Sequence, residues 1–214
     1  PWLPAGPQRL VDLGSGAGFP GWILAAARPD LTQVGVTFTK NVDPYEEAKI
    51  RILNGGHTCL AYLGALAGHH TFDQAMADPE LFAHFEEFER GEVLPALVEA
   101  LPFDKNLYLD QIITRFKNAS IGDTVERICA DGYLKFPIFI HPTLAGCLKQ
   151  GILPRAGLRA IASWYVFCKH IESGALPIAY GEPYWDNLRE LLQEGQVDRF
   201  AQSVSLWGAL PQDH

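Results

Sequence analysis

Cysteine is scarce in this sequence: there are four residues, at positions 59, 129, 147 and 168, with irregular spacings and no C-x-x-C pair. This spacing excludes a disulfide framework and a paired-cysteine zinc site, and favours a reduced protein whose cysteines are buried. The longest nearly apolar stretch, residues 160–168, has about half of the length that a transmembrane helix needs. The sequence opens without the basic and apolar segments of a signal peptide. We therefore expect a cytoplasmic protein without a membrane partner.

Basic residues are also few, 17 Lys and Arg against 25 Asp and Glu, which gives a formal net charge of −8. Such a charge repels phosphate backbones and argues against nucleic acid as a partner. Residues 1–32 contain two Arg and two Asp and are neutral, so the whole net charge lies in residues 33–214. This asymmetry indicates that the two stretches differ in kind.

The 214 residues contain 48% hydrophobic and 20% charged side chains, a composition typical of a globular chain with a sizeable core. Neither a repeat nor a low-complexity segment is present. We expect a mainly α fold in two parts. Residues 1–43 are predicted to form a short Gly-rich strand-turn-helix segment and a lead-in, and residues 44–214 an all-α domain.

The N-terminal part contains three closely spaced glycines, Gly14, Gly16 and Gly18. They follow a predicted short strand over residues 10–13 and precede a predicted helix over residues 22–28, and a second strand is predicted over residues 34–38. A strand, a Gly-rich turn and a helix can together present backbone N–H groups to a cofactor. These glycines are therefore candidates for cofactor binding.

From Pro44 onward the apolar residues recur at helical spacing. Ser120 and Asp123 are expected to cap one of the helices, and Gly132 to end it. The predicted helices cover residues 45–68, 81–89, 92–101, 107–116, 121–130, 142–151, 158–171, 186–193 and 197–207.

The first of these helices carries four polar residues on one face, Glu46, Lys49, Asn54 and His57, and an interior Gly55-Gly56 pair. Each interior glycine costs about 1 kcal/mol relative to alanine, which indicates close approach by a ligand or another backbone. With Lys49 at zero and ~100° per residue, Glu46 falls near ~60°, His57 near ~80° and Asn54 near ~140°. A lysine, a carboxylate, an amide and an imidazole on one face can move a proton and polarise a carbonyl. The alternative is an ordinary solvated helix face.

Several segments resemble the polyol-specific long-chain dehydrogenases, the family of mannitol 2-dehydrogenase, D-arabinitol 4-dehydrogenase and the hexuronate reductases. The resemblance runs from about Arg28 to the C-terminus. It is carried by the pattern K-x4-N-x2-H at Lys49–His57 within PYEEAKIRILNGGHTCLAYLGALAG, by RFKN at Arg115–Asn118, and by DTVERICADGYLKFP at Asp123–Pro137.

The resemblance implies roles for four residues of the first helix. Lys49 matches the catalytic acid/base that takes the proton from the oxidised hydroxyl, which requires a lowered pKa. Asn54 matches one of two amides that stabilise the developing alkoxide, and His57 matches the imidazole that orients the substrate. Glu46 matches a carboxylate that relays protons to water.

The resemblance further implies that Arg127 and Lys135 bind the distal hydroxyls of the polyol, that NAD or NADP accepts the hydride, and that no metal takes part. It places a Rossmann domain before the all-α domain. Only 43 residues precede Pro44, too few for half of such a domain. We therefore expect this chain to need a Rossmann domain in trans for activity, or to self-associate through the face left uncovered.

Two other functions stay open. Residues 11–21 resemble the first motif of S-adenosylmethionine-dependent methyltransferases, closest to a small-subunit ribosomal RNA methyltransferase. The acidic residue that the motif needs after its second strand is missing, since Thr39, Lys40 and Asn41 stand there. Residues 1–27 then form a segment foreign to the dehydrogenase part. The second alternative is a helical interaction module without catalysis.

Overall fold

The structure is a computed structural model that describes residues 41–97, 100–193 and 197–208, together with the single positions 30, 33, 37, 39 and 210. It divides into two compact units, Pro1–Glu47 and Ala48–His214. The glycines at 14, 16 and 18 lie outside the described residues. So do the predicted strand over 10–13, the predicted helix over 22–28 and nearly all of the predicted strand over 34–38. The functional boundary between residues 43 and 44 stays a prediction.

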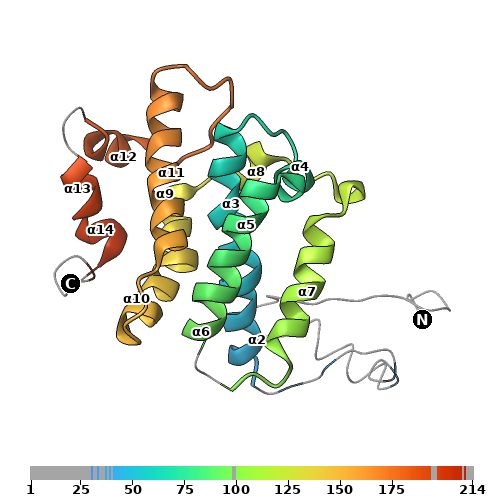
Figure 1. Cartoon of the computed structure of the whole chain (residues 1–214). Helices are drawn as coiled ribbons and strands as arrows, with labels where there is room; N and C mark the ends of the chain where they lie inside the picture. Colours follow the sequence, from blue (N-terminus) through green and yellow to red (C-terminus); the bar gives the residue numbers. More distant parts are fainter. Residues whose placement is uncertain are drawn as a thin grey trace. The chain divides into compact units, whose positions relative to one another are not determined.

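Helices form all the regular structure of the described residues, apart from an isolated bridge between Thr71 and Thr124, and this confirms the expected all-α class (Figure 1). The elements are α2 (Asp43–Ala48), η2 (Lys49–Asn54), α3 (Gly55–Leu66), α4 (Phe72–Ala77), α5 (Pro79–Phe88), η3 (Glu89–Val93), α6 (Leu94–Ala96), α7 (Lys105–Phe116), η4 (Ala119–Ile121), α8 (Val125–Cys129), α9 (Gly132–Lys135), η5 (Phe136–Ile140), α10 (His141–Lys149), α11 (Arg155–Glu172), α12 (Trp185–Leu191), α13 (Val197–Ala201) and α14 (Val204–Trp207).

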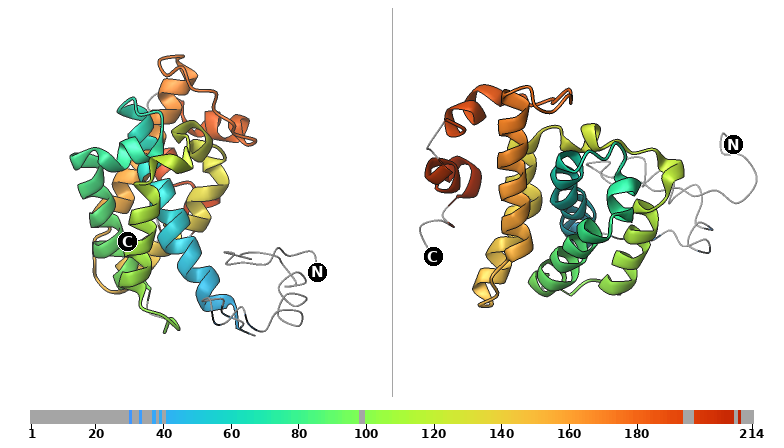
Figure 2. Two further views of the ribbon diagram at one scale, coloured as in Figure 1. Left: turned by 90° about the vertical axis from the view of Figure 1, so that its right-hand side faces the viewer. Right: turned by 45° about the horizontal axis from the view of Figure 1, so that its top comes forward.

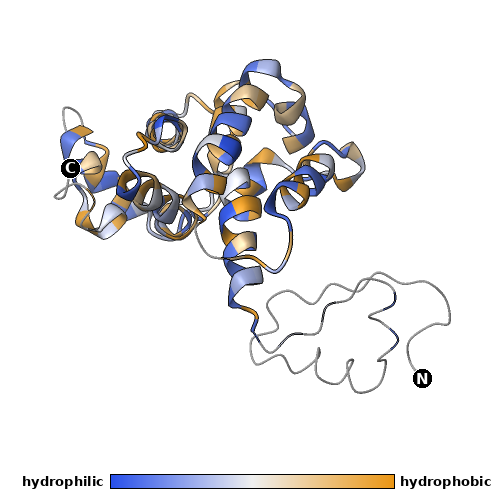
Figure 3. Cartoon of the chain, turned by 60° about the horizontal axis from the view of Figure 1, so that its bottom comes forward, coloured by the Kyte–Doolittle hydropathy of each residue, from blue (hydrophilic) through white to orange (hydrophobic). Residues whose placement is uncertain are grey.

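The core of the second unit lies between α3 and α11, which pack side by side (Figures 1 and 2). Tyr62 of α3 is fully buried, and its ring lies 5.5 Å from that of Phe136 and 5.1 Å from that of Phe167. Its hydroxyl donates to the Cys129 carbonyl at 2.8 Å. Trp164 of α11 stacks on Phe136 at 4.5 Å. The helices carry both hydrophobic and hydrophilic residues (Figure 3), as expected for helices that turn one side to the core and another to solvent.

Close helix packing explains the two interior glycines of α3. A Cβ at Gly56 would lie 2.6 Å from Glu89 Oε1 and 2.9 Å from Phe85 Cε2. A Cβ at Gly55 would lie 3.2 Å from the Phe139 carbonyl oxygen. The close approach expected from the sequence is therefore made by the protein's own side chains and backbone.

Several details of the predicted helices are wrong. The helix predicted over 121–130 begins only at Val125, the helix predicted over 197–207 is interrupted between Ala201 and Val204, and α4 and α9 were not predicted. The helix predicted over residues 45–68 contains a π-helical segment, η2, between α2 and α3. The helix predicted over 92–101 ends at Ala96, where the Lys105 ammonium donates to the carbonyls of Leu94 and Leu97 at 2.6 and 3.2 Å. A lysine from a later helix thus satisfies the carbonyl groups that a longer helix would have used.

The caps predicted around residues 120–132 are also wrong. Gly122, with a φ of +65°, follows the short η4, and Thr124 instead caps α8 by accepting from the Arg127 N–H at 3.3 Å. Asp123 bonds to the Arg127 side chain. Gly132 begins α9 because the chain reverses one residue earlier, at Asp131, whose φ is +60°.

Candidate functional site

The π-helical turn changes the relation between the residues of the K-x4-N-x2-H pattern. In η2 the Gly55 N–H donates to the Ile50 carbonyl five residues back, so each residue advances roughly 80° in place of 100°. Asn54 then lies roughly 40° from Lys49, and His57, three α-helical residues further on, lies within roughly 20° of it. The α-helical angles expected from the sequence were wrong, and the three groups share a narrower face than expected.

The exposure of η2 agrees with this orientation. Lys49, Asn54 and His57 are each partly buried. Arg51, two residues after Lys49, is 5% exposed, and its Nε donates to the Thr143 hydroxyl at 3.0 Å. Neither Lys49 nor Asn54 forms a side-chain hydrogen bond within the described residues, so both remain available to a ligand. Glu46 lies in α2 within the first unit, and its relay role stays a prediction.

His57 is held between two aromatic rings. It stacks on Phe116 of α7 with the ring centroids 4.1 Å apart and meets the edge of Phe72 at 4.7 Å. Burial lowers the pKa of His57 to about 4, and the nearby Asp123 carboxylate opposes this shift only in part. The imidazole is therefore neutral at pH 7 and can donate one hydrogen bond and accept another.

A small cavity of about 10 Å³ adjoins His57, with room for about one water molecule. It is lined by His57, Phe72, Asp73, Arg115, Phe116, Asn118, Ile121 and Asp123. Arg115 and Asn118 had no expected functional role, and Asp123 was expected only to cap a helix together with Ser120. The signal was present in the RFKN segment, whose two polar ends are both at this cavity.

The two residues expected to bind distal hydroxyls lie on successive short helices. Arg127 of α8 is exposed and pairs with Asp123, its Nε lying 3.0 Å from Asp123 Oδ1. Lys135 of α9 is half-buried, and its ammonium donates to the Ile128 carbonyl at 2.9 Å. Burial lowers the pKa of Lys135. The positive charges of Arg127 and Lys135 both contribute to the lowered pKa of His57.

The described residues contain no cluster of three or more His, Cys, Asp or Glu side chains that could hold a metal ion. No helix in the described part of the chain is both long and apolar enough to cross a membrane.

The fold and the polar face of η2 and α3 define an all-α domain of the kind found in polyol dehydrogenases. The model of the mannitol dehydrogenase C-terminal domain matches residues 41–214, so the chain belongs to the mannitol dehydrogenase family and contains its C-terminal domain. The resemblance stated from the sequence is thereby confirmed.

Individual relatives agree with this assignment. D-arabinitol 4-dehydrogenase of Klebsiella pneumoniae is 36% identical over 86% of this chain and 41% of its own length. Mannitol 2-dehydrogenase of Cereibacter sphaeroides is 38% identical over 77% of this chain and 35% of its own length. The structure of Pseudomonas fluorescens mannitol 2-dehydrogenase in ternary complex with NAD and D-mannitol is similar with a TM-score of 0.76 and 31% identity, over 85% of this chain and 37% of that one. The chain thus spans about two fifths of the length of these relatives.

Proposed function

We propose that the second unit is the polyol-binding and proton-transferring part of an NAD-dependent polyol dehydrogenase, which interconverts a sugar alcohol of the mannitol or D-arabinitol type and a ketose. The observation that carries this proposal is the π-helical turn, which aligns Lys49, Asn54 and His57 on one face. Membership of the mannitol dehydrogenase family supports it.

In the proposed reaction, the amine of Lys49 accepts the proton of the carbinol hydroxyl. The Asn54 side-chain N–H donates to the oxygen as it becomes an alkoxide. His57, neutral at pH 7, orients the same oxygen without adding a positive charge that would repel protonated Lys49. Arg127 and Lys135 donate to hydroxyls further along the polyol.

NAD, when bound, supplies the acceptor for the hydride that leaves the carbinol carbon. The described residues contain no strand from which a dinucleotide-binding fold could be built, so we assign none of them a contact with the nucleotide. We propose instead that a Rossmann domain provides this contact, on the same polypeptide or on a partner. The small size of the cavity beside His57 supports a site that a second domain completes.

We also infer a cytoplasmic location. The support is that all four cysteines are free and buried, as expected in a reducing compartment.

A chimera tests the proposed function. Residues 41–214 would be joined to the nucleotide-binding half of the P. fluorescens enzyme, and NADH formation followed with D-mannitol, D-arabinitol and D-sorbitol. We expect turnover of at least one polyol, and a loss of about 10²–10⁴-fold in kcat for Lys49→Ala with nicotinamide binding unchanged. Lys149→Ala, a change of an exposed lysine on α10, is the matched control. Full turnover in Lys49→Ala would refute the assignment.

A further inference from the structure

Glu182 is a carboxylate that the proposed reaction does not use, although it makes several hydrogen bonds beside the segment bearing Lys135. Its Oε2 accepts from the Tyr133 N–H at 3.0 Å and from the Tyr180 hydroxyl at 2.8 Å. Its Oε1 accepts from the Tyr184 N–H at 3.1 Å. We call these groups, with Trp164, the Glu182 network.

The network is anchored in the core of the unit. The indole Nε1 of Trp164 donates to the Tyr180 hydroxyl at 3.2 Å, and Trp164 itself is fully buried on α11. The ring of Tyr180 packs edge-on against Phe167 of the same helix, with the centroids 5.1 Å apart. The hydrogen bonds through Trp164 and Tyr180 therefore fix the Glu182 carboxylate relative to α11.

The other side of the network holds α9. This helix has only four residues, so its first N–H groups need partners from outside. The Tyr133 N–H donates to the Glu182 carboxylate, and the Asp131 N–H donates to the Gly181 carbonyl at 2.8 Å. Gly132 lies so close that a Cβ there would be 2.5 Å from Trp164 Nε1 and 2.8 Å from the Tyr180 hydroxyl.

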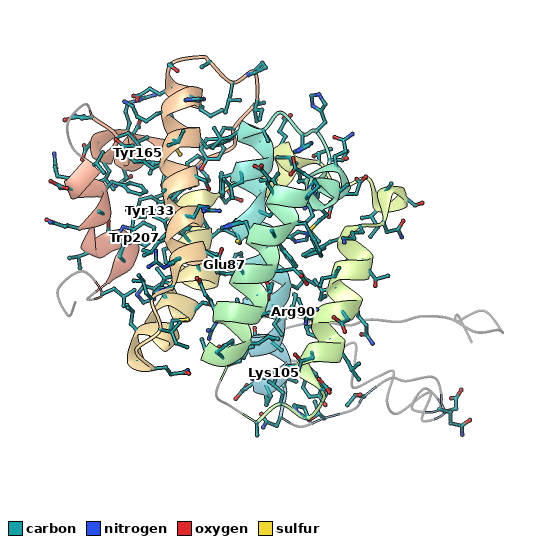
Figure 4. The ribbon with its side chains drawn as sticks, in the orientation of Figure 1. Glu87, Arg90, Lys105, Tyr133, Tyr165 and Trp207 are labelled. Carbon is teal, nitrogen blue, oxygen red and sulfur yellow. The ribbon has the colours of Figure 1, made fainter. Side chains whose placement is uncertain are left out.

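The location of α9 decides where Lys135 lies relative to Arg127. The two residues belong to α8 and α9, which are joined by the sharp reversal at Ala130 and Asp131. Asp131 adopts a left-handed conformation, with a φ of +60°, which aspartate tolerates better than most residues other than glycine but which still costs free energy. Such a backbone persists only when its surroundings hold it, and Gly181 and Glu182 provide that hold. Tyr133 also contacts the C-terminal helices, since its hydroxyl lies 3.2 Å from the Ser205 hydroxyl (Figure 4).

We propose that Glu182 is a positioning residue for polyol binding, acting through Tyr133 and α9 to set the place of Lys135. This inference rests on the proposed function. It adds that the loop before α12, far from the K-x4-N-x2-H pattern in sequence, determines the geometry of the distal-hydroxyl site.

The first experiment needs no catalysis. Hydrogen exchange of the Tyr133 amide is measured in the 214-residue chain and in the variants Glu182→Ala and Glu190→Ala. Glu190 is an exposed glutamate on α12 and serves as the matched control. We expect exchange at Tyr133 to accelerate by about tenfold or more in Glu182→Ala only. Unchanged protection in Glu182→Ala would overturn the proposal.

The second experiment measures KM and kcat of the chimera described above. Glu182→Ala is expected to raise KM for the polyol by about tenfold while kcat and KM for NAD stay within about twofold, because a misplaced Lys135 weakens substrate binding alone. Glu182→Gln keeps a carbonyl oxygen for Tyr133 N–H and is expected to restore most of the affinity. If Lys135→Ala raises KM for the polyol but Glu182→Ala leaves it unchanged, the positioning role of Glu182 is wrong. A wild-type chimera without turnover would instead refute the proposed function, and the exchange result would still decide whether Glu182 holds α9.

Discussion

Glu89 is the residue whose surroundings depart most from those of an ordinary charged group. It is fully buried in η3, and neither carboxylate oxygen has a hydrogen-bond partner within the described residues. Burial raises the pKa of Glu89 well above its usual range, although the positive charge of Arg51 opposes the shift. A raised pKa favours the neutral form of this carboxyl group, which lowers the cost of burying it.

The raised pKa predicts a pH-dependent effect of Glu89→Gln. The folded protein keeps a proton that the unfolded chain loses above pH ~4.5, so the stabilising contribution of Glu89 declines as the pH rises above that value. The amide cannot ionise, and we expect Glu89→Gln to raise the free energy of unfolding at pH 8 by more than about 1 kcal/mol and to change it little at pH 4.5. Urea denaturation at both pH values measures this.

The matched control for this variant is Glu87→Gln, since Glu87 is an exposed glutamate near the end of α5 (Figure 4). Glu87→Gln should change the free energy of unfolding by the same small amount at both pH values. A lower free energy of unfolding for Glu89→Gln at pH 8 would contradict the prediction and indicate that Glu89 is ionised.

At the scale of the elements, α11 shows how a helix can begin without a local cap. Pro154 precedes it and has no capping side chain. The carboxylate of Glu92, from η3, accepts instead from the N–H groups of Ala156 at 2.6 Å and Gly157 at 2.9 Å. A negative group at the N-terminus of this 18-residue helix also interacts favourably with the helix dipole.

We therefore expect Glu92→Ala to destabilise the fold by about 1–3 kcal/mol, because it leaves two buried N–H groups without a partner. Glu92→Gln, which keeps one acceptor oxygen, should cost less. Thermal and urea denaturation of these variants beside Glu190→Ala give the comparison. Equal stability of Glu92→Ala and wild type would show that water or another group replaces the carboxylate.

The elements also show which features the sequence could predict. The positions of α5, α7, α10 and α11 follow from apolar spacing along a few helical turns, and their prediction was largely correct. The end of α6 and the start of α11 depend on Lys105 and Glu92, residues from other parts of the chain, so no local pattern could reveal them. The same holds for η2, where local spacing identified Lys49, Asn54 and His57 as one face but could not show the extra residue in the turn.

At the scale of the whole second unit, the buried histidines and the buried glutamates change the pH dependence of stability in opposite directions. Burial lowers the pKa values of His57 and His84 to about 4, so the unfolded chain binds protons below pH ~6.5 that the folded chain does not, and stability falls toward acid pH. Burial raises the pKa values of Glu89 and Glu92, so stability also falls as the pH rises above ~4.5.

The two effects oppose each other between about pH 4.5 and 6.5, and above about pH 6.5 only the carboxyl groups act, so we expect stability to decline on the alkaline side. Each histidine contributes a loss of roughly 3 kcal/mol as the pH falls from about 6.5 to 4. Urea denaturation at half-unit intervals from pH 4 to 9 would trace this pH dependence. A stability maximum at pH 8 or above would contradict it.

The extra residue of η2 has a consequence for how this segment tolerates changes in length. Deleting one residue between Lys49 and Asn54 would turn the segment into a regular α-helix. The four remaining steps of ~100° would turn through the same total of roughly 400° as the five π-helical steps of ~80°, so Lys49 would keep its angular relation to His57. One further residue inserted here would instead turn Lys49 away from His57 by about a quarter of a turn, so we expect this segment to tolerate the loss of a residue better than the gain of one.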